Sequence, residues 1–248
     1  MAVNTDKNSY TIVFAIAMVL VVGSLLAFTA SSLKPTITEN MRMEKQQNIL
    51  YAMGVNENEG TSREFVSTDN VAAEFSKYIK QQLVVDAKGG FTEDSEAYLI
   101  DVKKEQAKAK NGETRRLPLF VGEKDGKTFY IAPIRGKGLW DAIWAYIALD
   151  KNMVVQGVFF DHKGETPGLG ANINQRFFMD DFTGERLLDD NGKFKGIAVA
   201  KGNNDPKNLI KDDHEVDAIA GSTITGDGVS AMLKADLKLY LPYFKNLN

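Results

Sequence analysis

A run of twenty residues near the N-terminus, positions 11–30, contains no charged side chain and constrains this chain more than any other feature. A helix rises about 1.5 Å per residue, so this length spans roughly 30 Å, the thickness of the hydrocarbon core of a bilayer. Lys7 precedes the run, and Lys34 and Pro35 follow it. The run predicts one transmembrane helix at about residues 11–31 that anchors the chain in membrane lipid.

A cleaved signal peptide is the alternative interpretation, because residues 30–32, Ala-Ser-Ser, resemble a small-residue cleavage site. Signal peptides have apolar cores of about 7–15 residues, so the length of this run favours a retained anchor. The flanking charges do not decide which side of the membrane the remaining chain occupies. Lys7 stands before the run, and Lys34, Arg42 and Lys45 follow it.

The composition excludes several functional classes. The chain has no cysteine, which excludes disulfides, thiolate catalysis, iron–sulfur clusters and cysteine-bound zinc. His162 and His214 are its two histidines, so no metal site is predicted. The net charge of −3 offers no basic surplus for nucleic acid, which is therefore not an expected partner. Any redox chemistry must then come from an organic cofactor.

Residue patterns divide the chain into three predicted parts: an N-terminal segment with the transmembrane helix (1–34), a helical region (35–95) and a domain (96–248). In the helical region, a capping box at Thr36 and Glu39 starts a helix that continues to about Met53. Apolar spacing predicts a second helix over residues 70–84, after a polar loop.

The third part carries strand patterns between helical ones. Apolar alternation and turn residues predict two β-hairpins, and helices precede and follow them, which indicates an α+β fold with an antiparallel sheet and flanking helices. The predicted strands are residues 97–102, 117–121, 128–134, 140–149, 153–161 and 195–200, and the predicted helices are residues 172–182 and 228–244.

Residues 217–225, Asp-Ala-Ile-Ala-Gly-Ser-Thr-Ile-Thr, are the most informative stretch for function. Small and hydroxyl residues here predict a turn that ends at a helix N-terminus, where free N–H groups and the helix dipole favour a phosphate. The glycines in and after this stretch let a ligand approach the backbone and leave Thr225 accessible to a modifying enzyme. The alternative is an ordinary helix start, in which Thr223 or Thr225 is the N-cap and Asp227 lies in the first turn.

These nine residues resemble the flavinylation motif of the FMN-binding domain family, Asp-x-x-Ser/Ala-Gly-Ala/Ser-Thr-x-Thr. In that family a flavin transferase attaches FMN to the last threonine through a phosphoester bond. The resemblance therefore implies that Thr225 carries FMN, with Asp217, Gly221, Ser222 and Thr223 completing the motif.

Two further segments are similar to the same family. Residues 136–140, Gly-Lys-Gly-Leu-Trp, resemble its Gly-x-Gly-Leu-Trp turn, and residues 165–170, Glu-Thr-Pro-Gly-Leu-Gly, resemble its flavin-facing loop. Without the resemblance, the tryptophan is expected in the core, and Thr-Pro-Gly is a tight turn with Pro second and Gly third. The resemblance to the FMN-binding domain family makes six residues candidates for non-covalent FMN contacts: Trp140, Glu165, Thr166, Gly168, Leu169 and Lys201. Without the resemblance, Lys201 is expected to be a solvated lysine.

The layout of one anchor, a helical region and a C-terminal flavin domain resembles the C subunit of the sodium-translocating NADH:quinone oxidoreductases (Nqr). The alternative is the G subunit of the Rnf electron-transport complex, which shares the anchor and the motif. Either resemblance implies a single-pass protein of the bacterial inner membrane with its C-terminal domain in the periplasm.

The resemblance to the Nqr protein implies that covalent FMN relays electrons between other subunits of a sodium-pumping complex. No Gly-x-Gly-x-x-Gly fingerprint opens a strand–helix unit, so NADH must bind another subunit. The chain is thus expected to be part of an enzyme without oxidising NADH alone. The competing class is a non-redox structural subunit, which would be colourless.

Overall fold

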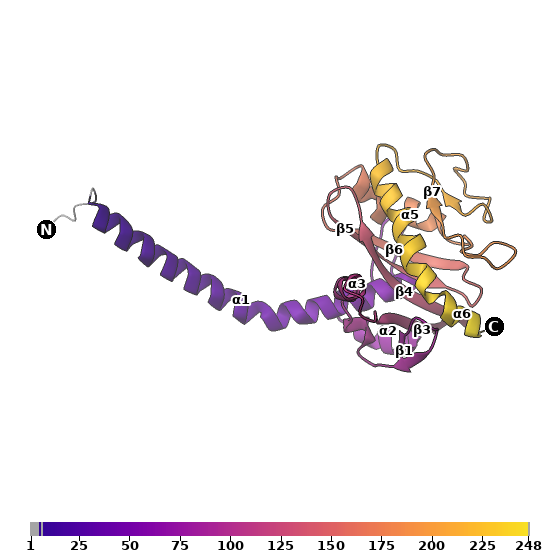
Figure 1. Cartoon of the computed structure of the whole chain (residues 1–248), viewed down its shortest axis with the longest axis horizontal. Helices are drawn as coiled ribbons and strands as arrows, with labels where there is room; N and C mark the ends of the chain where they lie inside the picture. Colours follow the sequence, from indigo (N-terminus) through magenta and orange to yellow (C-terminus); the bar gives the residue numbers. More distant parts are fainter. Residues whose placement is uncertain (1–4, 6, 248) are drawn as a thin grey trace. The chain divides into compact units, whose positions relative to one another are not determined.

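The computed structural model describes residue 5 and residues 7–247, and Figure 1 shows its helices and strands along the chain. The chain divides into two compact units, Met1–Arg42 and Met43–Asn248. Helix α1 (Asn8–Ala52) contributes to both. The predicted helix start at Thr36 is wrong, because α1 continues through Pro35. The Thr38 hydroxyl donates to the carbonyl of Lys34, one turn earlier, within the same helix.

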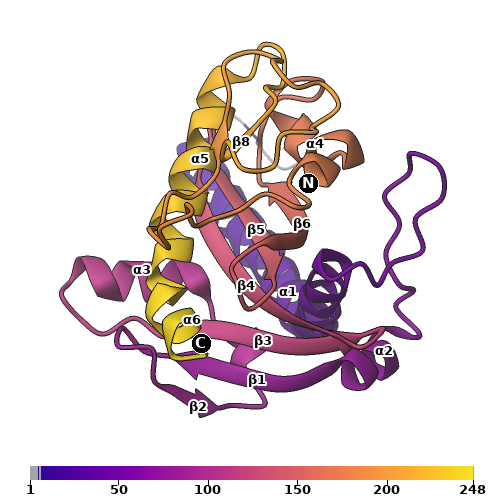
Figure 2. The ribbon, with the colours of Figure 1, turned by 90° about the vertical axis from the view of Figure 1, so that its right-hand side faces the viewer.

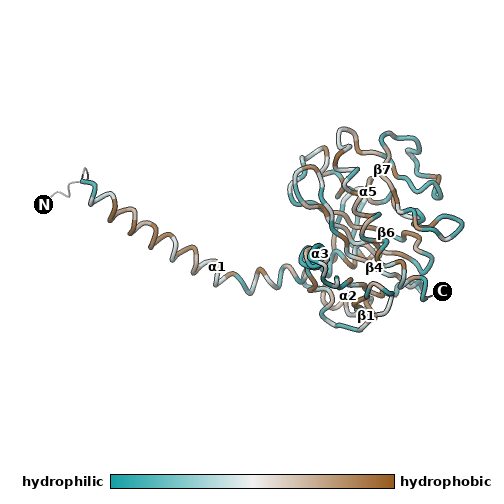
Figure 3. Tube along the Cα trace, viewed as in Figure 1, coloured by the Kyte–Doolittle hydropathy of each residue, from teal (hydrophilic) through white to brown (hydrophobic). Residues whose placement is uncertain are grey.

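The apolar run of the first unit lies inside α1 with its side chains exposed, as the brown stretch of that helix in Figure 3 illustrates. Within the described part of the chain, α1 is the one helix long and apolar enough to cross a membrane. No part of its most apolar window is buried by protein. A large uncovered apolar surface is unfavourable in water, so this helix is consistent with a single-pass membrane anchor.

The second unit is built on a six-stranded antiparallel sheet in the order β2-β1-β3-β4-β5-β6, with a short parallel pair, β7 and β8, beside it. Helices surround the sheet, which confirms the predicted α+β class. The strands are β1 (Ile79–Val85), β2 (Phe91–Glu93), β3 (Leu117–Lys124), β4 (Lys127–Lys137), β5 (Ala142–Leu149), β6 (Val155–His162), β7 (Ala198–Val199) and β8 (Glu215–Val216). The remaining helices are α2 (Val71–Tyr78), α3 (Val102–Lys110), α4 (Arg176–Asp181), α5 (Thr223–Leu237) and α6 (Leu241–Leu247), with 3₁₀ turns η1 (Ala97–Leu99), η2 (Gly170–Asn174) and η3 (Lys238–Tyr240).

Both predicted hairpins are confirmed. Strands β3 and β4 meet at Asp125 and Gly126, whose φ angles are 52° and 74°. Two positive φ values match the right-handed twist of the flanking strands, which is why Asp-Gly suits this turn. In the hairpin of β5 and β6, the Asp150 carboxylate accepts the N–H groups of Asn152 and Val154 and holds the turn.

Several predicted elements differ from the structure. Residues 172–182 contain η2 and then α4 rather than one helix, and the helix over residues 228–244 begins earlier and divides into α5, η3 and α6. The helix over residues 70–84 ends at Tyr78, and the chain continues as β1, because its alternate apolar side chains are buried against the sheet when β1 pairs with β3. Residues 97–102 form no strand: they contain η1 and then Asp101, which caps α3. The strand over residues 195–200 shortens to β7.

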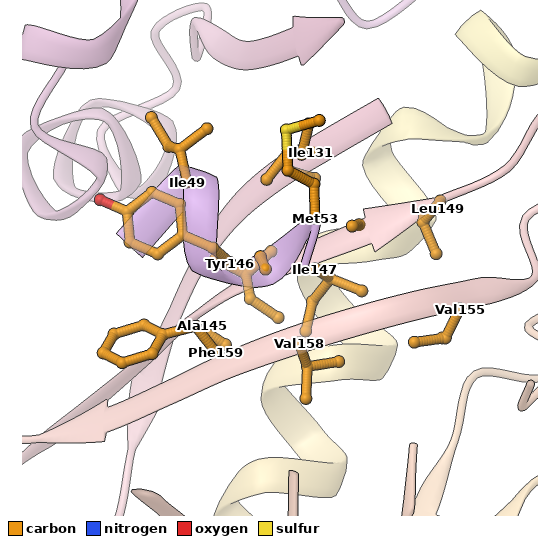
Figure 4. Close-up of a cluster of buried hydrophobic side chains, with 14 of the residues drawn as sticks. Ile49, Met53, Ile131, Ala145, Tyr146, Ile147, Leu149, Val155, Val158 and Phe159 are labelled. Atoms are coloured by element: carbon orange, nitrogen blue, oxygen red, sulfur yellow. The ribbon is translucent and has the colours of Figure 1, made fainter. Parts of the chain in front are cut away.

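Helices pack on both faces of strands β4 to β6. Figure 4 shows Ile49 and Met53 of α1 on one side of these strands, above Ile147 and Val158, with α5 behind them. Two glycines permit the close approach. A Cβ at Gly157 of β6 would lie 2.5 Å from the carbonyl oxygen of Ala52, and a Cβ at Gly228 of α5 would overlap the carbonyl of Lys137. Helix α5 thus lies directly along β4, as Figure 2 shows, and brings its N-terminus to the end of that strand.

Candidate functional site

The flavinylation-like motif leads into the first turn of α5. The helix begins at Thr223, five residues earlier than predicted, so Thr225 is its third residue. Ser222 occupies the N-cap position but makes no side-chain capping bond, so the hypothesis that Thr223 or Thr225 is the N-cap is wrong. Among the described residues, no protein acceptor takes the N–H groups of positions 223–225. Three backbone donors therefore remain available for an anion at this helix end.

The hydroxyl of Thr225 is bound to a carboxylate sixty residues away in the sequence. Thr225 Oγ1 donates to Glu165 Oε2 over 2.6 Å. Thr225 is 1% exposed and Glu165 is 4% exposed. The expectation that the glycines leave Thr225 openly accessible is therefore wrong, because the segment that carries Glu165 folds over its side chain.

Backbone donors hold Glu165 in its charged form. Its carboxylate accepts the N–H groups of Trp140 at 2.9 Å, Leu139 at 3.3 Å and Asp141 at 3.5 Å. Burial alone would raise the pKa of this carboxyl, but the Thr225 hydroxyl and the three N–H groups outweigh it and lower the pKa below its ordinary value. Glu165 is therefore ionised at neutral pH and acts as a hydrogen-bond acceptor.

A tight turn positions this loop. Leu169 N donates to Thr166 O over 3.1 Å, and Gly168 has a φ of 76°, so the predicted Thr-Pro-Gly turn is confirmed. Gly170 then lies directly beside the Thr225 hydroxyl. A Cβ there would lie 2.5 Å from Thr225 Oγ1 and 2.6 Å from Glu165 Oε2, so a side chain at this position would displace the pair.

The loop and the motif enclose a cavity of about 250 Å³. The Ser222 hydroxyl beside it is buried and has no hydrogen-bond partner among the described residues. An unpaired buried polar group is costly, so Ser222 is well placed to donate to a bound ligand. Leu139, Gly170 and Ile224 line this cavity although they were not predicted site residues. Each of these three lies inside one of the family-like segments, residues 136–140, 165–170 and 217–225, and that position was the one signal that pointed to them. The other lining residues are seven of the predicted ones: Glu165, Thr166, Leu169, Gly221, Ser222, Thr223 and Thr225.

Four other predicted site residues lie outside the cavity lining. Trp140 is 67% exposed, so its expected place in the core is wrong, and its Nε1 donates to Thr166 Oγ1 over 3.2 Å. The Asp217 carboxylate accepts the N–H of Asp205, and Lys201 is exposed. Gly168 lies in the Thr-Pro-Gly turn, where its positive φ is required. Within the described residues, no group of three or more histidine, aspartate or glutamate side chains is arranged to hold a metal ion.

Comparison with known proteins agrees with this geometry. Residues 138–238, which contain the cavity and α5, match the model of the FMN-binding domain family. The chain is 31% identical to the C subunit of the Na⁺-translocating NADH-quinone reductase of Pseudomonas aeruginosa, over 93% of this chain and 91% of that protein. It is 30% identical to the same subunit of Vibrio anguillarum, over 92% and 90% of the two chains.

A solved structure extends the likeness to the fold. The crystal structure of the C subunit from Parabacteroides distasonis superimposes with a TM-score of 0.74 at 32% identity, over 87% of this chain and 98% of that one. The chain belongs to the family of Na⁺-translocating NADH-quinone reductase C subunits. Of the two complexes that its layout suggested, the comparisons thus support Nqr, and the chain is a subunit of that reductase with an FMN-binding domain.

Proposed function

We propose that this chain carries FMN covalently on Thr225 and relays electrons between other subunits of the sodium-pumping complex. One observation carries the proposal: the motif's last threonine borders the cavity with its hydroxyl bound to a buried carboxylate. A hydrogen bond fixes the orientation of this hydroxyl at the border of the cavity, and a fixed orientation favours attack on a phosphorus atom.

The cavity suits the phosphate end of FMN. The free N–H groups at the start of α5 and the unpaired Ser222 hydroxyl would bind phosphate oxygens. At about 250 Å³ the cavity is smaller than the ~300–1,000 Å³ that encloses most ligands, so the flavin ring would extend outward. Leu139, Leu169 and Ile224 are exposed around the cavity and would contact the ring there.

Bound flavin supplies electron transfer, and the protein holds it and tunes its potential. In this proposal Thr166 and Trp140 support the flavin-facing loop through their hydrogen bond. Asp217 acts on the conformation of the motif through Asp205, and the exposed Lys201 is a candidate for the edge of the flavin ring. NADH oxidation belongs to another subunit, and the partners are the remaining Nqr subunits and a flavin transferase.

Expressed together with a flavin transferase, the purified chain should be yellow. It should give a fluorescent band on a denaturing gel and an intact mass increased by FMN minus water. It should accept electrons from dithionite but should not oxidise NADH at a rate above that of free flavin. A colourless protein of unmodified mass would instead support the non-redox structural role.

The topology of the chain is a second part of the proposal. An uncharged run of twenty residues inside α1 supports one membrane pass, with the flavin domain on the periplasmic side of the inner membrane. An alkaline phosphatase fusion after Asn248 should be active, while a cytoplasmic reporter at the same position should be silent. The chain should remain in the membrane fraction with its N-terminus intact. A shortened soluble chain would identify the run as a signal peptide.

A further inference from the structure

A second cavity, of about 560 Å³, is lined by Trp140 and by residues of α3 and β4. Its basic lining residues are Lys110, Arg115, Arg135 and Lys137. We propose that this cavity is a phosphate-binding site, separate from the cavity that borders Thr225. The linings of the two cavities share no residue, and the proposal does not depend on flavin attachment.

Helix α3 and strand β4 bring the cationic side chains together. Gln106 and Lys110 are four residues apart in α3, so they lie on the same face of the helix. Arg135 and Lys137 are two residues apart in β4, so they lie on the same face of the strand. The Gln106 side-chain amide donates to the carbonyl of Arg135 over 2.6 Å and ties the helix to the strand. The cavity between them is therefore part of the folded domain.

Three of these cations are not neutralised by the protein. Among the described residues, no hydrogen bond or ion pair joins the side chain of Lys110, Arg135 or Lys137 to another group. Asp141, the carboxylate in the lining, is paired with Lys163 Nζ at 2.9 Å. Like charges gathered around one cavity repel one another, and an anion bound among them would relieve that repulsion.

Arg115 adds a buried donor to the lining. Its Nη1 donates to Asp236 over 2.9 Å, and its side chain is 13% exposed. Its Nε is buried and has no hydrogen-bond partner among the described residues. A buried N–H group without an acceptor is costly, and an anion oxygen in the cavity that Arg115 lines would be a suitable acceptor.

The lining suits a phosphate group that carries an organic substituent. Guanidinium groups form paired hydrogen bonds with phosphate oxygens, and lysine adds a compact positive charge. The cavity lies within the ~300–1,000 Å³ range of most small-molecule sites and is larger than a phosphate group requires. Trp140 is 67% exposed, and the bond from its Nε1 to Thr166 holds the indole in place, so its ring offers an apolar surface to the substituent. A free phosphate compound and a phospholipid headgroup both have this chemistry.

The test uses the full-length chain in phosphatidylcholine nanodiscs, with pyrophosphate as the soluble probe. The chain has two tryptophans, Trp140 and Trp144, so a Trp144→Phe background leaves Trp140 as the one source of indole fluorescence. Emission is followed at constant ionic strength, so that screening by salt is the same at every probe concentration.

We expect pyrophosphate to change the Trp140 emission and to reach saturation. Lys137→Gln should weaken binding about tenfold, and Arg135→Gln/Lys137→Gln about a hundredfold, because each change removes a charge-assisted hydrogen bond. Arg135 binds Asp236 and Gln106 through its backbone only, so these variants should remain folded. Lys127→Gln is the matched control, since it removes the same charge from an exposed lysine of β4 outside the cavity. It should change the affinity by less than about twofold.

Nanodiscs that contain phosphatidylglycerol distinguish the two sources of phosphate. If a lipid headgroup is the ligand, phosphatidylglycerol alone should change the Trp140 emission, and the double variant should remove that change. If a free phosphate compound is the ligand, phosphatidylglycerol should have no effect while pyrophosphate still binds.

A chain that responds to neither pyrophosphate nor phosphatidylglycerol would overturn the inference. Equal weakening by Lys127→Gln and Lys137→Gln would overturn it as well, because net charge rather than this cavity would then attract the anion. Calorimetry compares the unmodified chain with the chain that carries FMN, and loss of pyrophosphate binding in the latter would assign the cavity to the flavin. The unmodified chain is measured in every case, so a failure of flavin attachment leaves this test intact.

Discussion

Replacing Thr225 by valine should abolish the covalently bound flavin and, in the reassembled complex, NADH-driven quinone reduction. Valine keeps the shape of the buried side chain but removes the oxygen that forms the phosphoester bond. Glu165 still has its three backbone donors, so the domain should remain folded. In-gel fluorescence should fall to background, and the intact mass should be that of the unmodified chain.

Thr128→Val is the control, since Thr128 is an exposed threonine of β4 that lies outside the cavity lining. It should keep the fluorescent band and most of the quinone reductase activity. A Thr225→Val chain that still fluoresces on a denaturing gel would show that another residue carries the flavin. If the Thr225→Val complex shows no flavin fluorescence but reduces quinone at the wild-type rate, the proposed role of this flavin in electron transfer is wrong.

The Asp236→Ala variant should lose about 3 kcal/mol of unfolding free energy, at the lower end of the 3–5 kcal/mol for breaking a buried ion pair. Asp236 lies in α5, and its carboxylate accepts from Arg115 Nη1 at 2.9 Å, from Gln106 Nε2 at 3.1 Å and from Arg135 N at 3.0 Å. Removing it leaves the guanidinium, whose side chain is 13% exposed, without its partner. Urea unfolding of the detergent-solubilised chain measures the change.

Asp227→Ala is the control for this prediction, because Asp227 is an exposed residue of the same helix and should change the unfolding free energy by about 0.5 kcal/mol or less. The double variant Asp236→Ala/Arg115→Ala should lose less than the sum of the two single variants, since neither then leaves a buried charge alone. A loss under about 1 kcal/mol for Asp236→Ala, or strict additivity in the double variant, would show that this network does not hold α5 on the sheet.

Features encoded by neighbouring residues could be predicted from the sequence. The long apolar helix follows from an uncharged run of sufficient length, and the β3–β4 hairpin from Asp125 and Gly126, which adopt positive φ at low cost. The candidate attachment site is contained in nine consecutive residues. Each of these depends on local backbone chemistry, which does not require knowledge of the fold.

Contacts between distant residues were decided by the tertiary structure. Residues 79–85 have helical spacing, but pairing with β3 buries their alternate side chains, so they form β1. No sequence pattern joins Thr225 to Glu165, sixty positions apart, or predicts that a loop covers the threonine. Trp140 lies outside the core for the same reason, since its burial depends on which surfaces meet. The sequence by itself thus determined the apolar helix, the hairpins and the position of the candidate attachment motif. The folded chain decided which carboxylate faces the Thr225 hydroxyl, because that contact exists only once β4, the loop and α5 have packed together.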